Sequence, residues 1–323
     1  MPGIKTFAVP ETGVYMETCP GECKVQVGVF DPDLPGPENR MRILNNAFDE
    51  QAVHIVTKLA QEPGEWGFVD EIGYLESGCL IYMDALRSLL AHKRIIAAVR
   101  QNTPFLQELR NRADVFCVDL DEPFGNTGCV IMASGLSRRF GNNKLLADFR
   151  GEPMIHRILC ATDSIFSRRV VVTRHPEIAA LCKERGIDVV LHDQPHRSDT
   201  IRLGLQAVGD VQGCMFCAAD QPLVSQPTIA SIVLSSVDDP TSIWRTCFGE
   251  TPGLPALFPQ WTFAALMDLP QGKGGGFVIR MHPEHVRTIP VQNAAELMDA
   301  DDPETLAKLA AIDFEPLCSW RNL

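Results

Sequence analysis

Short apolar runs alternate with amphipathic segments along most of this chain. In the first part, residues 24–30 and 94–99 have the composition of strands, and residues 47–60 and 83–91 have apolar positions at helical spacing. Residues 115–120 are mostly apolar and predict a last strand of this part. Strands separated by helices usually lie in a parallel sheet, so the pattern predicts an α/β fold with parallel strands.

The same alternation resumes after a cluster of turn-forming residues at positions 122–128. We therefore predict a linker at residues 123–127 that separates a first domain, residues 1–122, from a second, residues 128–323. The second domain is also predicted to be α/β with a mostly parallel sheet. Its strands are expected at 128–132, 169–173, 188–191 and 214–218, and its helices at 153–161, 177–185, 200–207 and 227–235.

The second domain opens with an apolar strand that leads into a loop of small and basic residues, here called the basic loop (residues 133–144). Small residues let backbone N–H groups approach an anion closely, and arginine and lysine add positive charge. The pattern predicts a phosphate-binding loop; the alternative is an ordinary connection with surface bases. The residues that carry it are Ala133, Ser134, Gly135, Ser137, Arg138, Arg139, Gly141 and Lys144.

A second strand of this domain delivers a carboxylate to its end. Residues 214–218 are apolar, and Asp220 follows just before Gln221 and Pro222. Ligands of open parallel sheets gather at the carboxyl ends of strands, and Mg²⁺ with a nucleoside triphosphate uses one or two carboxylates plus phosphate oxygens. Asp220 is therefore predicted to bind Mg²⁺; the alternative is an aspartate that begins a turn.

The basic loop resembles the L-A-x-G-x-S-x-R-x-G-x-x-K signature of the MobA/MocA-like nucleotidyltransferases, which attach a nucleotide to molybdopterin. Met132 stands in the place of the leucine, and Asp220 matches the aspartate of their D-Q-P element. The resemblance implies that Arg139, Lys144 and Asp220 act in catalysis. It implies nucleotide binding by Met132, Ala133, Ser134, Gly135, Leu136, Ser137, Arg138, Arg139, Lys144 and Ser198.

Three later segments extend the resemblance over nearly all of residues 128–323. Residues 197–205 are similar to a helix start that lies against the nucleotide, and Gly253 and Pro255 match a G-x-P-x-L-F element near the substrate. Residues 299–306 match D-I-D-T-P-E-D-L, where Asp302 is also expected to cap a helix. The resemblance implies a Rossmann-like three-layer sandwich.

One departure concerns a second acidic residue. Those enzymes supply it from a G-D-x-G segment, whereas the corresponding residues 271–276 contain glycines and Lys273 but no acid. A second magnesium ligand is therefore not predicted there. Lys273 either contacts a substrate phosphate or belongs to a flexible surface loop.

The first domain resembles a nucleoside-triphosphatase family related to P-loop kinases, on the strength of Gly3–Thr6 and an apolar strand that ends in Asp70-Glu71. The sequence contains no G-x-x-x-x-G-K-[ST] motif, which that family places before the position of Met1. This domain is therefore interpreted as degenerate or truncated, and hydrolysis of a nucleotide by it is not predicted. The loss of a central strand would leave an unpaired sheet edge, so homo-oligomers are compatible with it.

Composition narrows the function further. The chain of 323 residues has a formal charge of −12, which argues against a nucleic-acid surface, and 45% hydrophobic residues, which is typical of a folded protein. Neither a membrane span nor a signal peptide is apparent, so a cytoplasmic location is expected. Its eleven cysteines are interpreted as buried thiols; Cys214 and Cys217 should face opposite sides of a strand, and residues 282–285 should form a loop rather than a zinc site.

Together these features predict Mg²⁺-dependent transfer of a nucleotide, with CTP favoured, to the phosphate of molybdopterin, with release of pyrophosphate. Such chemistry depends on positioning and charge neutralisation more than on a covalent intermediate. Two alternatives remain open. One is a nucleotidyltransferase for a sugar or polyol phosphate. The other is a non-catalytic protein that binds molybdenum cofactor and delivers it to a molybdenum hydroxylase.

Overall fold

The computed structural model describes residues 1–34, 40–44, 46–137 and 139–314. By its internal contacts the chain divides into two compact units, Met1–Cys117 and Val118–Leu323. The predicted linker at residues 123–127 lies just beyond this division, inside the second unit, where Thr127 already begins a strand. The exact domain boundary stays a prediction.

The first unit is built on a mixed sheet with the strand order β4-β3-β2-β1-β5-β6. Strands β1 to β4 form an antiparallel meander, and β5 and β6 run parallel to β1. The prediction of a parallel sheet is therefore wrong for the meander, because short turns rather than helices connect β1 to β2 and β2 to β3. The strands are β1 (Gly3–Val9), β2 (Gly13–Cys19), β3 (Lys24–Phe30), β4 (Met41–Ile43), β5 (Trp66–Ile72) and β6 (Arg94–Val99).

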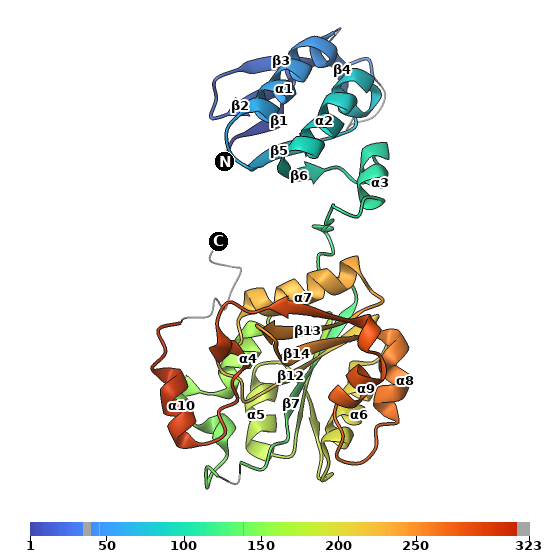
Figure 1. Cartoon of the computed structure of the whole chain (residues 1–323). Helices are drawn as coiled ribbons and strands as arrows, with labels where there is room; N and C mark the ends of the chain where they lie inside the picture. Colours follow the sequence, from blue (N-terminus) through green and yellow to red (C-terminus); the bar gives the residue numbers. More distant parts are fainter. Residues whose placement is uncertain (35–39, 45, 138, 315–323) are drawn as a thin grey trace. The chain divides into compact units, whose positions relative to one another are not determined.

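Helices of the first unit bury one face of this sheet. A π-helical turn, Ala47–Ala52, continues into α1 (Val53–Gln61), which packs beside α2 (Leu80–His92) over a core that includes Ile4, Val69 and Leu86 (Figure 1). Glu76–Gly78 forms a 3₁₀ turn, and α3 (Pro104–Arg110) starts at Thr103, whose side chain accepts a hydrogen bond from the Leu106 N–H.

The strand predicted at residues 115–120 does not form. This segment is irregular and belongs to neither sheet, and Phe116 and Leu120 are exposed. A short apolar run gives a strand only where another strand offers backbone partners, and this segment runs across the division between the units instead. The prediction was wrong for that reason.

The second unit is built on a sheet with the order β11-β10-β7-β12-β14-β13-β15, in which only β14 is antiparallel to its neighbours. A small hairpin, β8 (Asp148–Phe149) and β9 (Glu152–Pro153), lies apart from it. The strands of the large sheet are β7 (Thr127–Ala133), β10 (Arg168–Thr173), β11 (Asp188–Leu191), β12 (Gly213–Ala218), β13 (Ile243–Phe248), β14 (Thr251–Pro259) and β15 (Val286–Pro290).

Helices cover both faces of this sheet, as Figure 1 shows. One apolar core joins the sheet to α4, α5, α7 and α10, and a second joins it to α6, α8 and α9. The helices are α4 (Ile155–Ala161), α5 (Pro176–Glu184), α6 (Arg197–Val208), α7 (Gln226–Asp238), α8 (Phe263–Met267), α9 (Gly276–Met281) and α10 (Pro303–Ala310), with 3₁₀ turns at Lys144–Leu146, Gln260–Thr262, Pro283–His285 and Ala294–Leu297. The unit is therefore a Rossmann-like three-layer sandwich, as predicted.

Two details show how tightly these layers pack. A Cβ atom on Gly204 of α6 would lie 2.4 Å from Cγ1 of Val130, so the helix approaches β7 at backbone distance. Cys214 and Cys217 belong to the cores on opposite faces of β12, as predicted, and Cys217 Sγ lies 3.8 Å from Cys129 Sγ. Burial raises the pKa of Cys214, and the contact with Cys129 together with burial raises the pKa of Cys217.

No helix in the described part of the chain is both long and apolar enough to cross a membrane.

Candidate active site

The basic loop leaves the sheet at its carboxyl edge. Strand β7 is almost entirely buried and ends at Ala133, and the chain then runs without regular structure to the 3₁₀ turn Lys144–Leu146. Ser137 adopts a left-handed φ of 49°, and its hydroxyl accepts a hydrogen bond of 3.1 Å from the Lys144 N–H. The end of the loop is thus tied back to its middle, and Lys144 is turned toward the sheet edge.

Lys144 and Asp220 come together, as the sequence predicted for a shared site. Lys144 is only 6% exposed, and its Nζ lies 2.6 Å from Oδ2 of Asp220. Asp301 completes the network: its Oδ1 lies 3.3 Å from Lys144 Nζ, and its Oδ2 lies 3.3 Å from Nη1 of Arg139. Arg139 is largely exposed, and Arg138 lies outside the described residues.

The segment that carries Asp301 is fixed to the segment that carries Asp220 by backbone and amide hydrogen bonds. The Ala300 N–H donates to the Asp220 carbonyl at 2.8 Å, and Gln221 Nε2 donates to the Leu297 carbonyl at 3.2 Å. Their positions relative to each other therefore depend on contacts between residues 80 positions apart, which no local pattern specifies.

A buried carboxylate anchors the same segment from behind. Glu296 is 1% exposed, and its Oε2 accepts hydrogen bonds from the Ser225 N–H at 3.2 Å and from the Thr228 hydroxyl at 2.6 Å. Those groups lie at the start of α7, where a helix leaves backbone donors unpaired and favours negative charge. Glu296 thus joins the Ala294–Leu297 turn to α7.

Asp299 adds a third carboxylate. Partial desolvation of its carboxyl group and the charges of Asp220 and Asp301 raise the pKa of Asp299, although the residue as a whole is exposed. A hydrogen bond from Gln221 and the positive charge of Lys144 act in the opposite direction and lower the pKa of Asp299. The rise in pKa reports that negative charge is crowded at this point of the sheet edge.

Residues 299–301 therefore bring carboxylates to this edge of the sheet, whereas residues 271–276 contain none. The sequence had given this signal, because residues 299–306 match an acidic motif, but only the role of Asp302 as a helix cap was derived from it. That cap is present: Asp302 Oδ1 accepts a hydrogen bond of 2.7 Å from the Thr305 N–H. Within the described residues, no three histidine, cysteine or carboxylate side chains form a ready-made metal cage.

Two histidines that the sequence analysis did not single out hold the first residues of the basic loop. The Ser134 hydroxyl donates to the Val172 carbonyl at 3.1 Å and lies 2.8 Å from His192 Nε2, and His192 Nδ1 accepts from the Gln194 N–H at 3.1 Å. This pattern requires the neutral tautomer with hydrogen on Nε2. Burial and the charge of Arg174 lower the pKa of His192, in agreement with that state.

On the other side of the loop, His175 Nε2 lies 2.8 Å from the Gly135 carbonyl oxygen. The loop residues at and around these two contacts differ in exposure. Ala133 is buried, Ser134 is half-buried, and Leu136 is 51% exposed. Histidines at the ends of β10 and β11 thus set the path of a loop whose small residues leave its backbone accessible.

The predicted contacts from α6 and β14 lie at the same edge. Ser198 is fully buried in the first turn of α6, and its Oγ has no hydrogen-bond partner. Gly253 and Pro255 lie on β14, where a Cβ on Gly253 would approach Leu297 to 3.0 Å. Lys273 is exposed on an irregular segment before α9, and that segment packs at Gly274 against Arg197.

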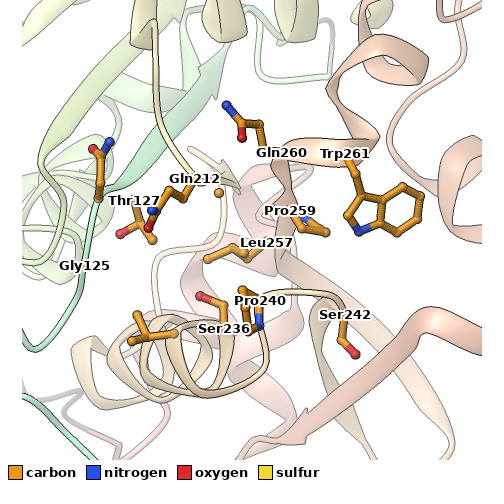
Figure 2. A pocket seen from close by; sticks show the side chains of 13 residues that line it. Gly125, Thr127, Gln212, Ser236, Pro240, Ser242, Leu257, Pro259, Gln260 and Trp261 are labelled. Carbon is orange, nitrogen blue, oxygen red and sulfur yellow. The ribbon is translucent and has the colours of Figure 1, made fainter.

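Figure 2 shows a different hollow, at the amino ends of β7 and β12 and thus at the opposite edge of the sheet. It has a volume of about 440 Å³. Several of its polar side chains bond within the protein: Trp261 donates to the Thr241 carbonyl, and the Ser242 hydroxyl donates to Asp239. The charged groups described above take no part in it.

The site therefore gathers small residues, cations and carboxylates at one edge of a parallel sheet. Residues 129–287 match the MobA-like NTP transferase domain. This part of the chain is a MobA-like domain.

Curated relatives of the MobA-like domain act on different substrates. A 3-deoxy-manno-octulosonate cytidylyltransferase from Neisseria gonorrhoeae is 37% identical over 97 residues, which cover 27% of this chain and 36% of that protein. A probable molybdenum cofactor guanylyltransferase from Natranaerobius thermophilus is 31% identical over 112 residues, which cover 33% of this chain and 54% of that protein. The chain thus spans about a third to a half of the length of these relatives.

Solved structures support the fold of the MobA-like domain. Rv0371c from Mycobacterium tuberculosis superposes with a TM-score of 0.52 and 24% identity, over 58% of this chain and 98% of that one. A nucleotidyl transferase from a Methanothermobacter superposes with a TM-score of 0.50 and 19% identity, over 57% of this chain and 96% of that one. At this level of identity the likeness concerns the fold alone.

Proposed function

We propose that the MobA-like domain transfers a nucleotide from a nucleoside triphosphate to an anionic acceptor and releases pyrophosphate. The observation that carries the proposal is the network of Lys144, Asp220, Asp301 and Arg139. It places two cations of the basic loop against carboxylates at a strand end. When a triphosphate and a divalent cation bind, Lys144 and Arg139 would pair with phosphate groups, and the carboxylates would pair with the cation.

In this mechanism Lys144 and Arg139 move from the carboxylates to phosphate oxygens of the nucleotide. Lys144 is nearly buried and remains paired throughout, which avoids the cost of a buried unpaired charge. The backbone of residues 133–137 lies along the nucleotide, with Ser134 held by His192. The acceptor oxygen then attacks the α-phosphorus in line with the departing pyrophosphate, and correct placement supplies most of the rate acceleration.

Asp220, with Asp301 or Asp299, is the candidate holder of Mg²⁺. The donor set fits, because Mg²⁺ bound to a nucleotide takes one or two carboxylates and keeps phosphate oxygens and waters as its other ligands. When bound, the ion would neutralise charge on the triphosphate. Once Lys144 turns to a phosphate, Asp220 and Asp301 are left close together with the negative charge that such an ion requires.

For the specific reaction we propose CTP as the nucleotide and the phosphate of molybdopterin as the acceptor. The support is the similarity of Ala133-Ser134-Gly135 and Asp220-Gln221-Pro222 to molybdenum cofactor cytidylyltransferases. A molybdenum hydroxylase apoenzyme would then receive the product. The carboxylates of residues 299–301 beside Lys144 and Arg139 favour an enzyme over a non-catalytic carrier of molybdenum cofactor.

A second acceptor class has its own support. The matched cytidylyltransferase from Neisseria gonorrhoeae is named for 3-deoxy-manno-octulosonate, a sugar acid. The second candidate is therefore transfer from CTP to a sugar acid or to a sugar or polyol phosphate.

The test is pyrophosphate release by the whole chain, with each nucleoside triphosphate paired with molybdopterin and with 3-deoxy-manno-octulosonate, in the presence of Mg²⁺. We expect CTP with one acceptor to give turnover, and Lys144→Ala or Asp220→Ala to lower kcat by about 100-fold or more, as removal of one electrostatic contact to a transition state does. Lys183→Ala, on exposed α5, is the matched control. Absence of turnover with every pair, by a folded protein, would sink the enzyme proposal.

A further inference from the structure

Arg245 is a partly buried cation that pairs with no carboxylate in the part of the chain that the structure describes. Its Nη2 donates to the Gly253 carbonyl at 3.3 Å, and its Nε is buried without a hydrogen-bond partner. Among the described residues, none of the carboxylates acts on its ionisation: burial lowers the pKa of Arg245, and the only opposing influence is the Cys247 thiol. A desolvated guanidinium without an anion is costly, so proteins keep one mainly where a ligand supplies the charge.

Sheet register places Arg245 on the α6 side of the sheet. Arg245 pairs with Ala256, Ala256 with Phe216, and Phe216 with Val130. Residues paired across strands point to the same face, and the three apolar ones belong to the core beneath α6. The Arg245 side chain therefore lies on the face where the first turn of α6 carries Ser198.

The guanidinium also reaches the active edge of the sheet. Gly253, whose carbonyl it contacts, packs against Leu297, and the Leu297 carbonyl accepts the hydrogen bond from Gln221, the residue after Asp220. Gly253 is thus linked to the residue after Asp220 through Leu297. In the strand order β12-β14-β13, Arg245 stands two strands beyond β12, on the side away from the basic loop.

That position separates Arg245 from the groups assigned to the triphosphate. Lys144 and Arg139 approach the carboxylates from the basic loop after β7, whereas Arg245 approaches from β13, with β12 and β14 between them. A molecule that attacks the nucleotide must occupy the space beside it. The planar fork of an arginine matches carboxylate and phosphate groups in two parallel hydrogen bonds.

We propose that Arg245 is the anion-binding residue of the acceptor subsite, so that the acceptor is held by a carboxylate or phosphate group on the β13–β14 side of Asp220. This rests on the proposed nucleotidyl transfer and adds the chemical class that the acceptor must present. The unpartnered Nε and the free positions of the guanidinium supply the donors.

The kinetic test compares Arg245→Met, Arg245→Lys and the wild-type chain in pyrophosphate release. Arg245→Met should raise KM for the acceptor by about 10- to 100-fold, the usual effect of losing a hydrogen bond to a charged group, and leave KM for the nucleotide unchanged. Arg245→Lys, which keeps the charge but not the fork, should fall between. Arg280→Met on α9, an exposed arginine, is the matched control. An unchanged KM for the acceptor would overturn the proposal.

A second measurement does not depend on turnover. Inorganic phosphate and acetate, at ionic strength matched with chloride, should each be tested for a rise in Tm of the wild-type chain. We expect at least one anion to stabilise it, and Arg245→Met, but not Arg280→Met, to show a smaller rise. Stabilisation by phosphate would indicate an acceptor with a phosphate group, and stabilisation by acetate would indicate one with a carboxylate group.

The two measurements separate the possible failures. If no pair of nucleotide and acceptor turns over, the proposed reaction is wrong. The rise in Tm with phosphate or acetate then still tests whether Arg245 binds an anion. If Arg245→Met keeps the full anion response, or instead only lowers Tm without an effect specific to the acceptor, Arg245 serves the β13–β14 hairpin and the subsite is refuted.

Discussion

At the sheet edge, hydrogen-bond partners fix the tautomer of a single side chain. His192 is the clearest case, because Gln194 donates to its Nδ1 and Ser134 accepts from its Nε2. A second proton on the ring would remove the acceptor that Gln194 uses. Burial and Arg174 lower the pKa of His192 from its usual 6.5, while Asp199 and Asp193 act in the opposite direction with less effect.

The lowered pKa of His192 makes the stability of the folded protein depend on pH. A histidine whose pKa is lowered by folding binds its proton more readily in the unfolded chain, so its contribution favours the folded state above pH 6.5 and is lost as the pH falls through and below that value. We expect Tm and nucleotide affinity to decline between about pH 7.5 and 5.5, and His192→Asn to flatten part of that decline.

The measurement is thermal unfolding and nucleotide binding across this range for His192→Asn and, as control, His285→Asn, which lies outside the site. An identical pH profile for all three proteins would contradict the role of His192.

At the scale of elements, the decisive contact is between the Ala294–Leu297 turn and α7. Replacing Glu296 by alanine leaves the Ser225 N–H and the Thr228 hydroxyl without their buried acceptor. Hydrogen bonds to a charged group contribute about 1.5–3 kcal/mol each, so the two together predict a fall in Tm of about 6–24 °C. Because the same segment carries Asp299 and Asp301, the Mg²⁺ concentration for half-maximal activity should rise.

Differential scanning calorimetry and a magnesium titration of activity measure the two effects. Glu296→Gln keeps an acceptor oxygen and should lose less, and Glu284→Ala on an exposed turn should change neither. A fall in Tm without any change in magnesium dependence would show that Glu296 stabilises the fold but does not position the carboxylates.

At the scale of the whole molecule, the two units have separate apolar cores. The core of the first unit is made of residues before position 118, and the two cores of the second unit lie on either face of its own sheet. All residues placed at the candidate site belong to the second unit. Units with their own cores generally fold alone.

We therefore expect a protein of residues 118–323 to keep pyrophosphate release within about threefold of the whole chain, since a domain with its own core folds by itself. Circular dichroism and Tm of the shortened protein establish that it is folded before its activity is compared. A folded but inactive protein would show that the first unit contributes to the reaction. The resemblance of that unit to nucleoside-triphosphatases stays a prediction.

Much of the fold could be predicted from local pattern. Residues 24–30, 94–99 and 188–191 coincide with observed strands, and the predicted helices of the second unit are found with small shifts at their ends. The failures have one physical cause. Residues 115–120 and the antiparallel meander β1–β4 depend on which strand lies next to which, and side-chain alternation is the same for either pairing.

The candidate site divides in the same way. The sequence determined the basic loop and Asp220, because small residues, cations and a strand-ending acid are local chemistry and their spacing is visible in one dimension. Only the tertiary structure decided that Asp299 and Asp301 lie near Lys144, that His192 and His175 contact the loop, and that Arg245 has no carboxylate beside it among the described residues. Those roles arise where distant segments meet at one edge of a sheet, since a charge acquires its function from the charges that folding brings within reach.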